Sequence, residues 1–312
     1  MVFMSKNITA NRITTTIITT TIIIMVTRYL KNKKRMLTAS CAKINLFLEL
    51  TGKLPNNYHQ VDTVLCSIDL FDYLDYEVID SPQIVLSCNI NQLANENNLI
   101  YKVASYLQNE YKIPNGISIK LKKSIPIAAG LGGGSSNAAN CILALNKLWQ
   151  LHLSKAEMHK IAAQFGSDIN FFLEGGTARG ENRGEIITKM PDIILNNILL
   201  INPGIAISSA EAYKLAYLTS KQEQHYFDIK NVYSSCFNRL EAGIRKVYPI
   251  VDEVINTLKQ YEAKVSMLSG SGSTCFGIFE NIAQLEKCKD YFSEKGFWTY
   301  RAKTINSENS IS

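Results

Sequence analysis

The most informative segment of this 312-residue chain reads Pro126-Ile-Ala-Ala-Gly-Leu-Gly-Gly-Gly-Ser-Ser136. Apolar and polar side chains alternate over residues 117–122, which predicts a strand before it, and residues 142–149 carry apolar side chains at helical spacing. Bare glycine backbone lets N–H groups approach an anion, and the helix start adds partial positive charge. The segment is therefore predicted to cradle phosphate. The alternative, a flexible Gly/Ser linker, would not lie between a strand and an amphipathic helix.

The type of phosphate loop is narrowed by elimination. A Walker sequence is absent, Ser135 occupies the third glycine position of a dinucleotide-binding loop, and the His-Arg-Asp and Asp-Phe-Gly signatures of protein kinases are absent. We expect Ser135 and Ser136 to cap the helix that follows. The residues predicted to bind the nucleotide are Pro126, Ile127, Ala128, Ala129, Gly130, Leu131, Gly132, Gly133, Gly134, Ser135 and Ser136.

The composition indicates a globular protein of about two domains. Hydrophobic residues make up 46% of the chain and charged residues 19%, which excludes global disorder. The seven cysteines are odd in number, and no pair has C-x-x-C spacing. Neither a disulfide framework nor a zinc site is predicted, and we expect a cytoplasmic location. The histidines His152, His159 and His225 show no metal-ligand spacing with Cys or acidic residues.

The net charge of +6 comes from one end of the chain. Residues 1–35 hold seven basic and no acidic residues, so the remainder is nearly neutral and gives no reason to expect a nucleic-acid partner. Residues 13–26 form an Ile/Thr-rich run that is too short for a membrane span and rich in β-branched side chains. We interpret residues 1–35 as a disordered extension, or as translated upstream sequence before a start at Met36. A basic surface anchor is the alternative.

Several separate segments resemble one enzyme superfamily, the GHMP kinases. The glycine-rich segment extends to Gly130-Leu-Gly-Gly-Gly-Ser-Ser-Asn-Ala-Ala139, which resembles their nucleotide loop. Ser40-Cys-Ala-Lys-Ile-Asn-Leu-Phe47 is similar to their opening strand, and Leu268-Ser-Gly-Ser-Gly-Ser-Thr-Cys-Phe276 to their third motif. Two further segments are Tyr58-His59 and Gly166-Ser-Asp-Ile-Asn170. Taken together, all these segments most resemble those of the superfamily branch that phosphorylates a cytidine diphosphate-linked methylerythritol. The resemblance runs from Met36 to about residue 303.

The resemblance implies an α+β fold of two domains. The N-terminal domain would be like ribosomal protein S5 domain 2, and the C-terminal domain would be ferredoxin-like. We place a non-family extension at residues 1–35, the ATP-binding domain at residues 36–185 and the C-terminal domain at residues 186–306. The active site is expected between the two domains.

The resemblance also assigns the catalytic residues. Taken alone, Asp168 suits a surface turn and Lys43 an outward-facing strand residue. In the family, the Asp of Gly-Ser-Asp is catalytic, and the lysine of the opening strand points inward towards it. Such an aspartate can take the proton of an attacking hydroxyl, and the ammonium would keep it ionised. ATP and Mg²⁺ are the implied cofactors, and the sequence does not identify the metal ligands.

The expected activity is ATP-dependent phosphorylation of the substrate's 2-hydroxyl in the non-mevalonate route to isoprenoid precursors. The rivals are a GHMP kinase for another small alcohol and a nucleotide-binding module without catalysis. The partner would be a small-molecule substrate, with no nucleic acid or stable membrane partner, and the protein a monomer or weak homodimer. The resemblance implies that the substrate is bound by Asn45, Tyr58, His59, Tyr213, Gly270 and Gly272, with rings at Tyr58 and Tyr213 around the cytosine.

Overall fold

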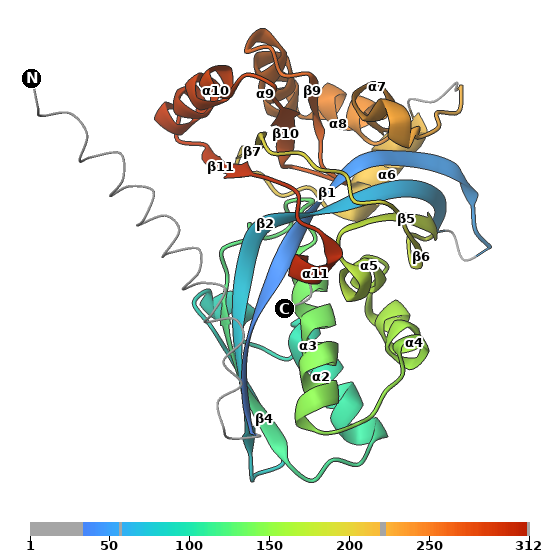
Figure 1. Cartoon of the computed structure of the whole chain (residues 1–312), viewed down its shortest axis with the longest axis vertical. Coiled ribbons are helices and arrows are strands. Elements are labelled where there is room, and N and C mark those ends of the chain that lie inside the picture. The colour runs from blue at the N-terminus through green and yellow to red at the C-terminus, as the bar shows by residue number, and fades with distance from the viewer. Residues whose placement is uncertain (1–33, 56–57, 219–222, 311–312) are drawn as a thin grey trace, which may run out of the picture.

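The computed structural model of the chain describes residues 34–55, 58–218 and 223–310. The predicted two-domain α+β fold is confirmed: a seven-stranded sheet and a four-stranded sheet each carry helices on their outer face (Figure 1). Most of the predicted N-terminal extension lies outside the described residues. Within the described part of the chain, no helix is both long enough and apolar enough to cross a bilayer.

The first sheet is built around two long antiparallel strands, β1 and β2, which pair along nearly their whole length. Its main strand order is β3-β4-β2-β1-β8, and β5 joins β2 and β6. The strands of this sheet are β1 (Arg35–Lys53), β2 (His59–Ile79), β3 (Ile84–Cys88), β4 (Gly116–Lys122), β5 (Thr177–Asn182), β6 (Ile186–Lys189) and β8 (Phe237–Asn238).

Helices cover one face of this sheet, below β1 and β2 in the view of Figure 1. They are α2 (Leu99–Glu110), α3 (Gly133–Leu148), α4 (Lys155–Phe165) and α5 (Ile169–Glu174), with a short C-terminal helix α11 (Ser307–Ser310) beside them. Helix α4 begins at a capping box in which Ser154 and Glu157 satisfy each other's backbone N–H groups. Gly166 is the C-cap of this helix and lies two residues before Asp168.

The second sheet has the strand order β11-β7-β10-β9, and all its neighbouring strands are antiparallel. If the four strands are numbered 1 to 4 along the chain, their order across the sheet is 4-1-3-2, which is the order of a ferredoxin-like domain. The strands are β7 (Ile198–Asn202), β9 (Val265–Leu268), β10 (Cys275–Ile278) and β11 (Trp298–Ala302). The helices of this half are α6 (Ser209–Leu218), α7 (Val232–Ser235), α8 (Glu241–Val247), α9 (Pro249–Gln260) and α10 (Ile282–Glu294).

Strand β1 is buried on both faces because the second sheet lies against it. Ala42, Ile44 and Leu46 pack in one apolar cluster with residues of the second sheet such as Leu200 and Phe276. The opposite face of β1 meets the layer of helices α2 to α5 through Cys41. The side chains of residues 38–49 in the middle of β1 are therefore buried whichever way they point, which is unusual for a polar residue such as Lys43.

The two halves of the chain exchange segments. Strand β6 pairs with β5 and so belongs to the first sheet, whereas β7 belongs to the second. The boundary between the two sheets therefore lies between Lys189 and Ile198. The domain boundary that we placed from the sequence, after residue 185, lies earlier in the chain. Strand β8 comes from the second half and pairs with β1 of the first sheet. The chain end also returns, since Ile305 N–H donates to the Ser67 carbonyl. These exchanges tie the domains together around β1.

The seven cysteines all lie in the described part of the chain and are free thiols there. Burial raises the pKa of the Cys41 thiol to about 11, with Cys66 at about 12. Such thiols stay protonated and unreactive at neutral pH.

We predict that a chain beginning at Met36 folds and keeps its activity. It loses the ion pairs of Lys34 with Asp80 and of Arg35 with Asp75, which lie at the exposed start of β1, where ion pairs contribute little. The measurements are the thermal midpoint and kcat/KM of this chain and of the full-length chain. A fall in kcat/KM of about tenfold with an unchanged midpoint would instead assign a functional role to residues 1–35.

Candidate active site

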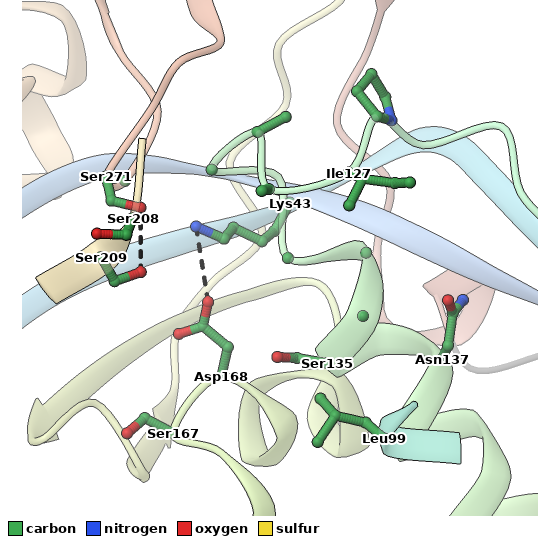
Figure 2. Close-up of a pocket in the computed structure, with 18 of the residues that line it drawn as sticks. Lys43, Leu99, Ile127, Ser135, Asn137, Ser167, Asp168, Ser208, Ser209 and Ser271 are labelled. Carbon is green, nitrogen blue, oxygen red and sulfur yellow. Dashed lines mark hydrogen bonds and ion pairs between the residues drawn. The ribbon is translucent and has the colours of Figure 1, made fainter. Parts of the chain in front are cut away.

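A cleft of about 1070 Å³ lies between the two domains and gathers most of the predicted site residues. Its walls come from the phosphate loop, from β1, from the turn between α4 and α5, and from the second domain. Figure 2 shows Lys43 and Asp168 pointing towards each other, with Ser135 nearby at the start of α3.

The phosphate loop leads directly into an uncapped helix. Gly132 precedes α3 in a left-handed conformation (φ 69°), and no side chain caps the helix. The first helical hydrogen bond is donated by the Ser136 N–H to the Gly132 carbonyl, at 2.9 Å. The amides of Gly133, Gly134 and Ser135 come before it, at the open end of the helix and beside the cleft. This end is suited to an anion.

The two serines do not cap the helix as predicted. Helix α3 begins at Gly133, so Ser135 and Ser136 already lie in its first turn. Ser136 is buried and turns towards β1, where its hydroxyl pairs with that of Ser40 at 2.9 Å. The helix end thereby stays open for a ligand.

Three residues of the predicted set do not line the cleft: Leu131, Ser136 and Gly272. Leu131 points into the apolar cluster between the sheets. Gly272 packs against Leu268, since a Cβ added there would lie 2.8 Å from the leucine side chain. Nine of the predicted loop residues do line the cleft: Pro126, Ile127, Ala128, Ala129, Gly130, Gly132, Gly133, Gly134 and Ser135.

The glycines of the loop are needed for different reasons. A Cβ on Gly132 would lie 2.8 Å from the Phe172 ring and 3.0 Å from Lys43 Cγ, so this glycine allows protein packing. A Cβ on Gly130 would lie 2.1 Å from the Ser269 carbonyl oxygen, so the loop can approach the second domain closely. At Gly134 the nearest atom would be 4.0 Å away. Gly134 alone of these three leaves open space on the cleft side.

Lys43 and Asp168 form an ion pair inside the cleft, with Nζ and Oδ2 separated by 3.7 Å. The lysine side chain is 4% exposed and the aspartate 40%, so the carboxylate is the member that solvent or substrate can reach. The lysine also donates to Asn45 Oδ1 at 2.5 Å, from the same face of β1. Burial lowers the pKa of Lys43, and the neighbouring Asp168 opposes that shift.

The second domain closes over this pair with its glycine-rich turn between β9 and β10. A Cβ on Gly270 would lie 3.0 Å from Lys43 Nζ and 3.1 Å from Asn45 Oδ1. Asn238 holds the turn by donating to the carbonyls of Leu268 and Gly270. Glycine, at a φ of +54°, suits this position because a side chain here would be in tight contact with Lys43 and Asn45.

The far end of the cleft carries the predicted aromatic residues. His59 and Tyr213 stack on each other, with ring centroids 5.1 Å apart and 17° between the planes. Tyr58 lies at the rim and is 57% exposed. Burial, followed by the charge of Asp168, raises the pKa of Tyr213, and burial lowers the pKa of His59. The phenol and a neutral imidazole are therefore the favoured forms.

Several cleft residues were not found from the sequence. Arg183, in the turn between β5 and β6, places its guanidinium 5.6 Å from the centre of the Tyr58 ring. Lys123 lines the cleft beside the phosphate loop, and Ser208 and Ser209 line it at the start of α6. Figure 2 shows Ser209 close to Ser271 of the glycine-rich turn, their hydroxyls 3.3 Å apart. Isolated residues of these types carry no sequence signal.

No cluster of three or more His, Cys, Asp or Glu side chains able to hold a metal ion occurs in the part of the chain that the structure describes. A hard cation shared with phosphate oxygens needs fewer protein ligands.

Comparison with known proteins agrees with the geometry. Residues 98–176 match the GHMP kinases N terminal domain, and residues 229–297 match the GHMP kinases C terminal domain. The fold is similar to that of a crystal structure of homoserine kinase from Cytophaga hutchinsonii, with a TM-score of 0.67 and 15% identity over 89% of this chain and 97% of that one. The chain is a GHMP kinase.

More similar relatives define the branch. The chain is 35% identical over 290 residues to 4-diphosphocytidyl-2-C-methyl-D-erythritol kinase of Bacillus pumilus, covering 89% of this chain and 99% of the relative. It is 37% identical to the enzyme of that name from Thermoanaerobacter pseudethanolicus, covering 88% and 97%. A crystal structure of 4-(cytidine 5'-diphospho)-2C-methyl-D-erythritol kinase has a TM-score of 0.75, covering 87% of this chain and all of that one, at 24% identity. This chain belongs to the 4-diphosphocytidyl-2-C-methyl-D-erythritol kinase family.

We predict that Gly134→Val weakens nucleotide binding while the protein stays folded. The new side chain would enter open space at the end of α3 where the helix amides face the cleft. Gly132→Val is the matched contrast, because it would collide with Phe172 and Lys43 and lower the thermal midpoint. Calorimetry with ADP and thermal unfolding separate the two effects. Unchanged ADP affinity in folded Gly134→Val would contradict the assignment of the helix end as the phosphate site.

Proposed function

We propose that this protein phosphorylates the 2-hydroxyl of 4-diphosphocytidyl-2-C-methyl-D-erythritol with ATP, giving the 2-phosphate and ADP in the non-mevalonate pathway of isoprenoid precursor biosynthesis. The observation that carries the proposal is one cleft holding the Lys43–Asp168 pair between an uncapped helix end and a pair of stacked rings. The helix end suits the phosphates of ATP, and the rings suit a nucleobase. The reacting hydroxyl would lie between them.

In this proposal, Asp168 accepts the proton of the attacking hydroxyl. Its carboxylate is the accessible member of the ion pair and stands at the start of α5 rather than within it. Lys43 is held by Asn45 and by the turn at Gly270, so its ammonium has a defined position beside the carboxylate. It stabilises the negative charge that develops during phosphoryl transfer. Positioning and electrostatics provide most of the acceleration, because the protein itself forms no covalent bond.

We further propose Mg²⁺ as the metal that accompanies ATP. Ser135 and Asp168 both line the cleft and present oxygen ligands. They lie near each other, since a Cβ on Gly166, two residues before Asp168, would be 4.0 Å from Ser135 Oγ. These two side chains fit a cation that takes its other ligands from phosphates and water. Bound there, the metal would neutralise charge on the phosphates of ATP.

The stacked rings would recognise the cytidine end. His59 and Tyr213 form one stacked pair in the cleft wall, with Tyr58 at the rim, and the cytosine would pack against this aromatic group. A neutral His59 offers one donor and one acceptor to the base edge. Arg183 would contribute charge to the substrate's diphosphate. Its side-chain hydrogen bonds to Glu185 and to the Ala163 carbonyl are both 3.4 Å, near the limit for such bonds.

A GHMP kinase for another small alcohol would share the phosphate loop and the catalytic pair but would have no use for an aromatic stack at the far end. A nucleotide-binding module without catalysis would not need the buried lysine beside Asp168. The nearly neutral body and free cysteines also favour a cytoplasmic enzyme with a small-molecule substrate and no nucleic-acid partner, acting as a monomer or weak homodimer.

We predict that Asp168→Asn lowers kcat by about 10²-fold or more, because the amide cannot accept the hydroxyl proton. The affinity for ADP measured without Mg²⁺ should change little, since the glycine-rich loop is untouched. Lys43→Ala should also lower kcat, and its thermal midpoint reports any loss of packing in β1. Steady-state kinetics with calorimetry check both variants. Near-normal turnover by Asp168→Asn would remove this residue from the catalytic role.

We predict that Tyr213→Ala raises KM for the cytidyl substrate by roughly 5- to 150-fold, the equivalent of ~1–3 kcal/mol for one stacked ring. The ratio of activities on this substrate and on 2-C-methyl-D-erythritol 4-phosphate, which lacks the cytidyl group, should fall in Tyr213→Ala and in Arg183→Gln. ADP affinity is the control and should not move. If the wild-type enzyme used the truncated compound equally well, the proposed substrate would be wrong, and a broader alcohol kinase would replace it.

A further inference from the structure

Asp72 is a wholly buried carboxylate on β2 that takes no part in the chemistry described above. We propose that Asp72 is a positioning residue that sets the geometry of the phosphate loop and thereby the affinity for ATP. It touches neither substrate nor nucleotide in this proposal and acts through the backbone and side chains that it holds.

The carboxylate binds both ends of the phosphate loop. Oδ1 accepts the backbone N–H groups of Ser124 at 2.7 Å and Ile125 at 2.9 Å, immediately before Pro126. Oδ2 accepts Asn137 Nδ2 at 3.0 Å, one turn into α3. A single side chain therefore fixes where the loop begins and where the helix that ends it lies. A loop clamped at both ends presents its amides in one arrangement before the nucleotide arrives.

The same oxygen holds a cation beside the helix end. Lys123 Nζ donates to Asp72 Oδ2 at 2.5 Å, and a Cβ on Gly133 would lie only 2.8 Å from that ammonium. A positive charge at a helix N-terminus is unfavourable without a neighbouring anion, since the helix end is itself partly positive. Asp72 supplies that anion, so the ammonium can stay next to the first residue of α3. Asp72 thereby fixes the position of a hydrogen-bond donor beside the helix end.

A purely structural role is the alternative, because buried ion pairs also tie elements together elsewhere in this fold. Glu49 on β1 offers a matched control. It is 1% exposed, accepts the N–H groups of Leu50 and His225, and pairs with Arg239 of the second domain. Glu49 contacts no residue of the phosphate loop in these hydrogen bonds. Both carboxylates accept two backbone amides and one cation, but only Asp72 holds the loop.

The experiment compares Asp72→Asn with Glu49→Gln in the full chain. Asparagine keeps one oxygen that can accept the two backbone N–H groups. Its NH₂ group replaces the other oxygen, so Lys123 and Asn137, which are both donors, lose their acceptor. We expect KM for ATP and the Kd of ADP to rise about tenfold or more, with KM for the alcohol substrate changed by less than about twofold. Glu49→Gln should lower the thermal midpoint by a similar amount while ADP binding stays within about twofold of wild type.

The proposal would be overturned if Asp72→Asn had a lowered thermal midpoint but kept the wild-type KM for ATP and the wild-type Kd for ADP. Asp72 would then be a structural residue. If this variant is not recovered folded, Asp72→Glu carries the same readouts. It keeps the charge but displaces the acceptor by one methylene, so weaker ADP binding supports the proposal and wild-type binding refutes it. The inference rests on one part of the proposed function, the binding of ATP at the glycine-rich loop. ADP calorimetry needs no alcohol substrate, so a wrong substrate assignment would leave this result standing.

Discussion

The arrangement of this protein depends on the burial of β1 on both faces. One face packs on the second sheet through Ala42, Ile44 and Leu46, and the other faces the helices of the first domain. A lysine on such a strand loses its hydration and requires polar partners. Lys43 finds them in Asn45 and Asp168, which come from the same strand and from the start of α5. The Lys43–Asp168 ion pair, which we propose to be catalytic, is thus assembled by the packing of the first domain.

The cleft is organised for anions at both ends. The uncapped start of α3 and the ammonium of Lys123 lie at the nucleotide end, and Arg183 lies near the rings at the other. Each cationic side chain of the cleft forms an ion pair with an acidic residue of the protein. The pairs are Lys123 with Asp72, Lys43 with Asp168 and Arg183 with Glu185. Under the proposed function, the phosphates of ATP and of the substrate would meet cations whose positions these acidic partners already fix.

Close approach between the domains is equally important, and glycine makes it possible. Gly130 lets the phosphate loop touch Ser269, and Gly270 lets the opposite turn touch Lys43. The carbonyl of Gly130 also accepts the Ser269 hydroxyl at 3.0 Å. The glycine-rich segments of the two domains thus meet each other as well as the cleft. Their glycines serve packing in part, which a phosphate-loop interpretation alone does not reveal.

The sequence alone indicated an α+β chain and a glycine-rich loop between a strand and a helix, because glycine spacing, strand alternation and helical periodicity are local properties of the chain. For Lys43 and Asp168 the sequence indicated a shared role only through the family resemblance, since the local pattern favoured an outward-facing lysine and a surface turn. It did not determine which loop glycines face the ligand, since Gly132 and Gly134 look alike until Phe172 is placed beside one of them. It also missed Asp72, Lys123 and Arg183, which lie far apart in the chain and carry no motif. Their contacts become visible only in the folded protein, because a hydrogen bond or an ion pair depends on the distance between atoms in space, and for Asp72 and Lys123 that distance is set by the packing of β2, β4 and α3.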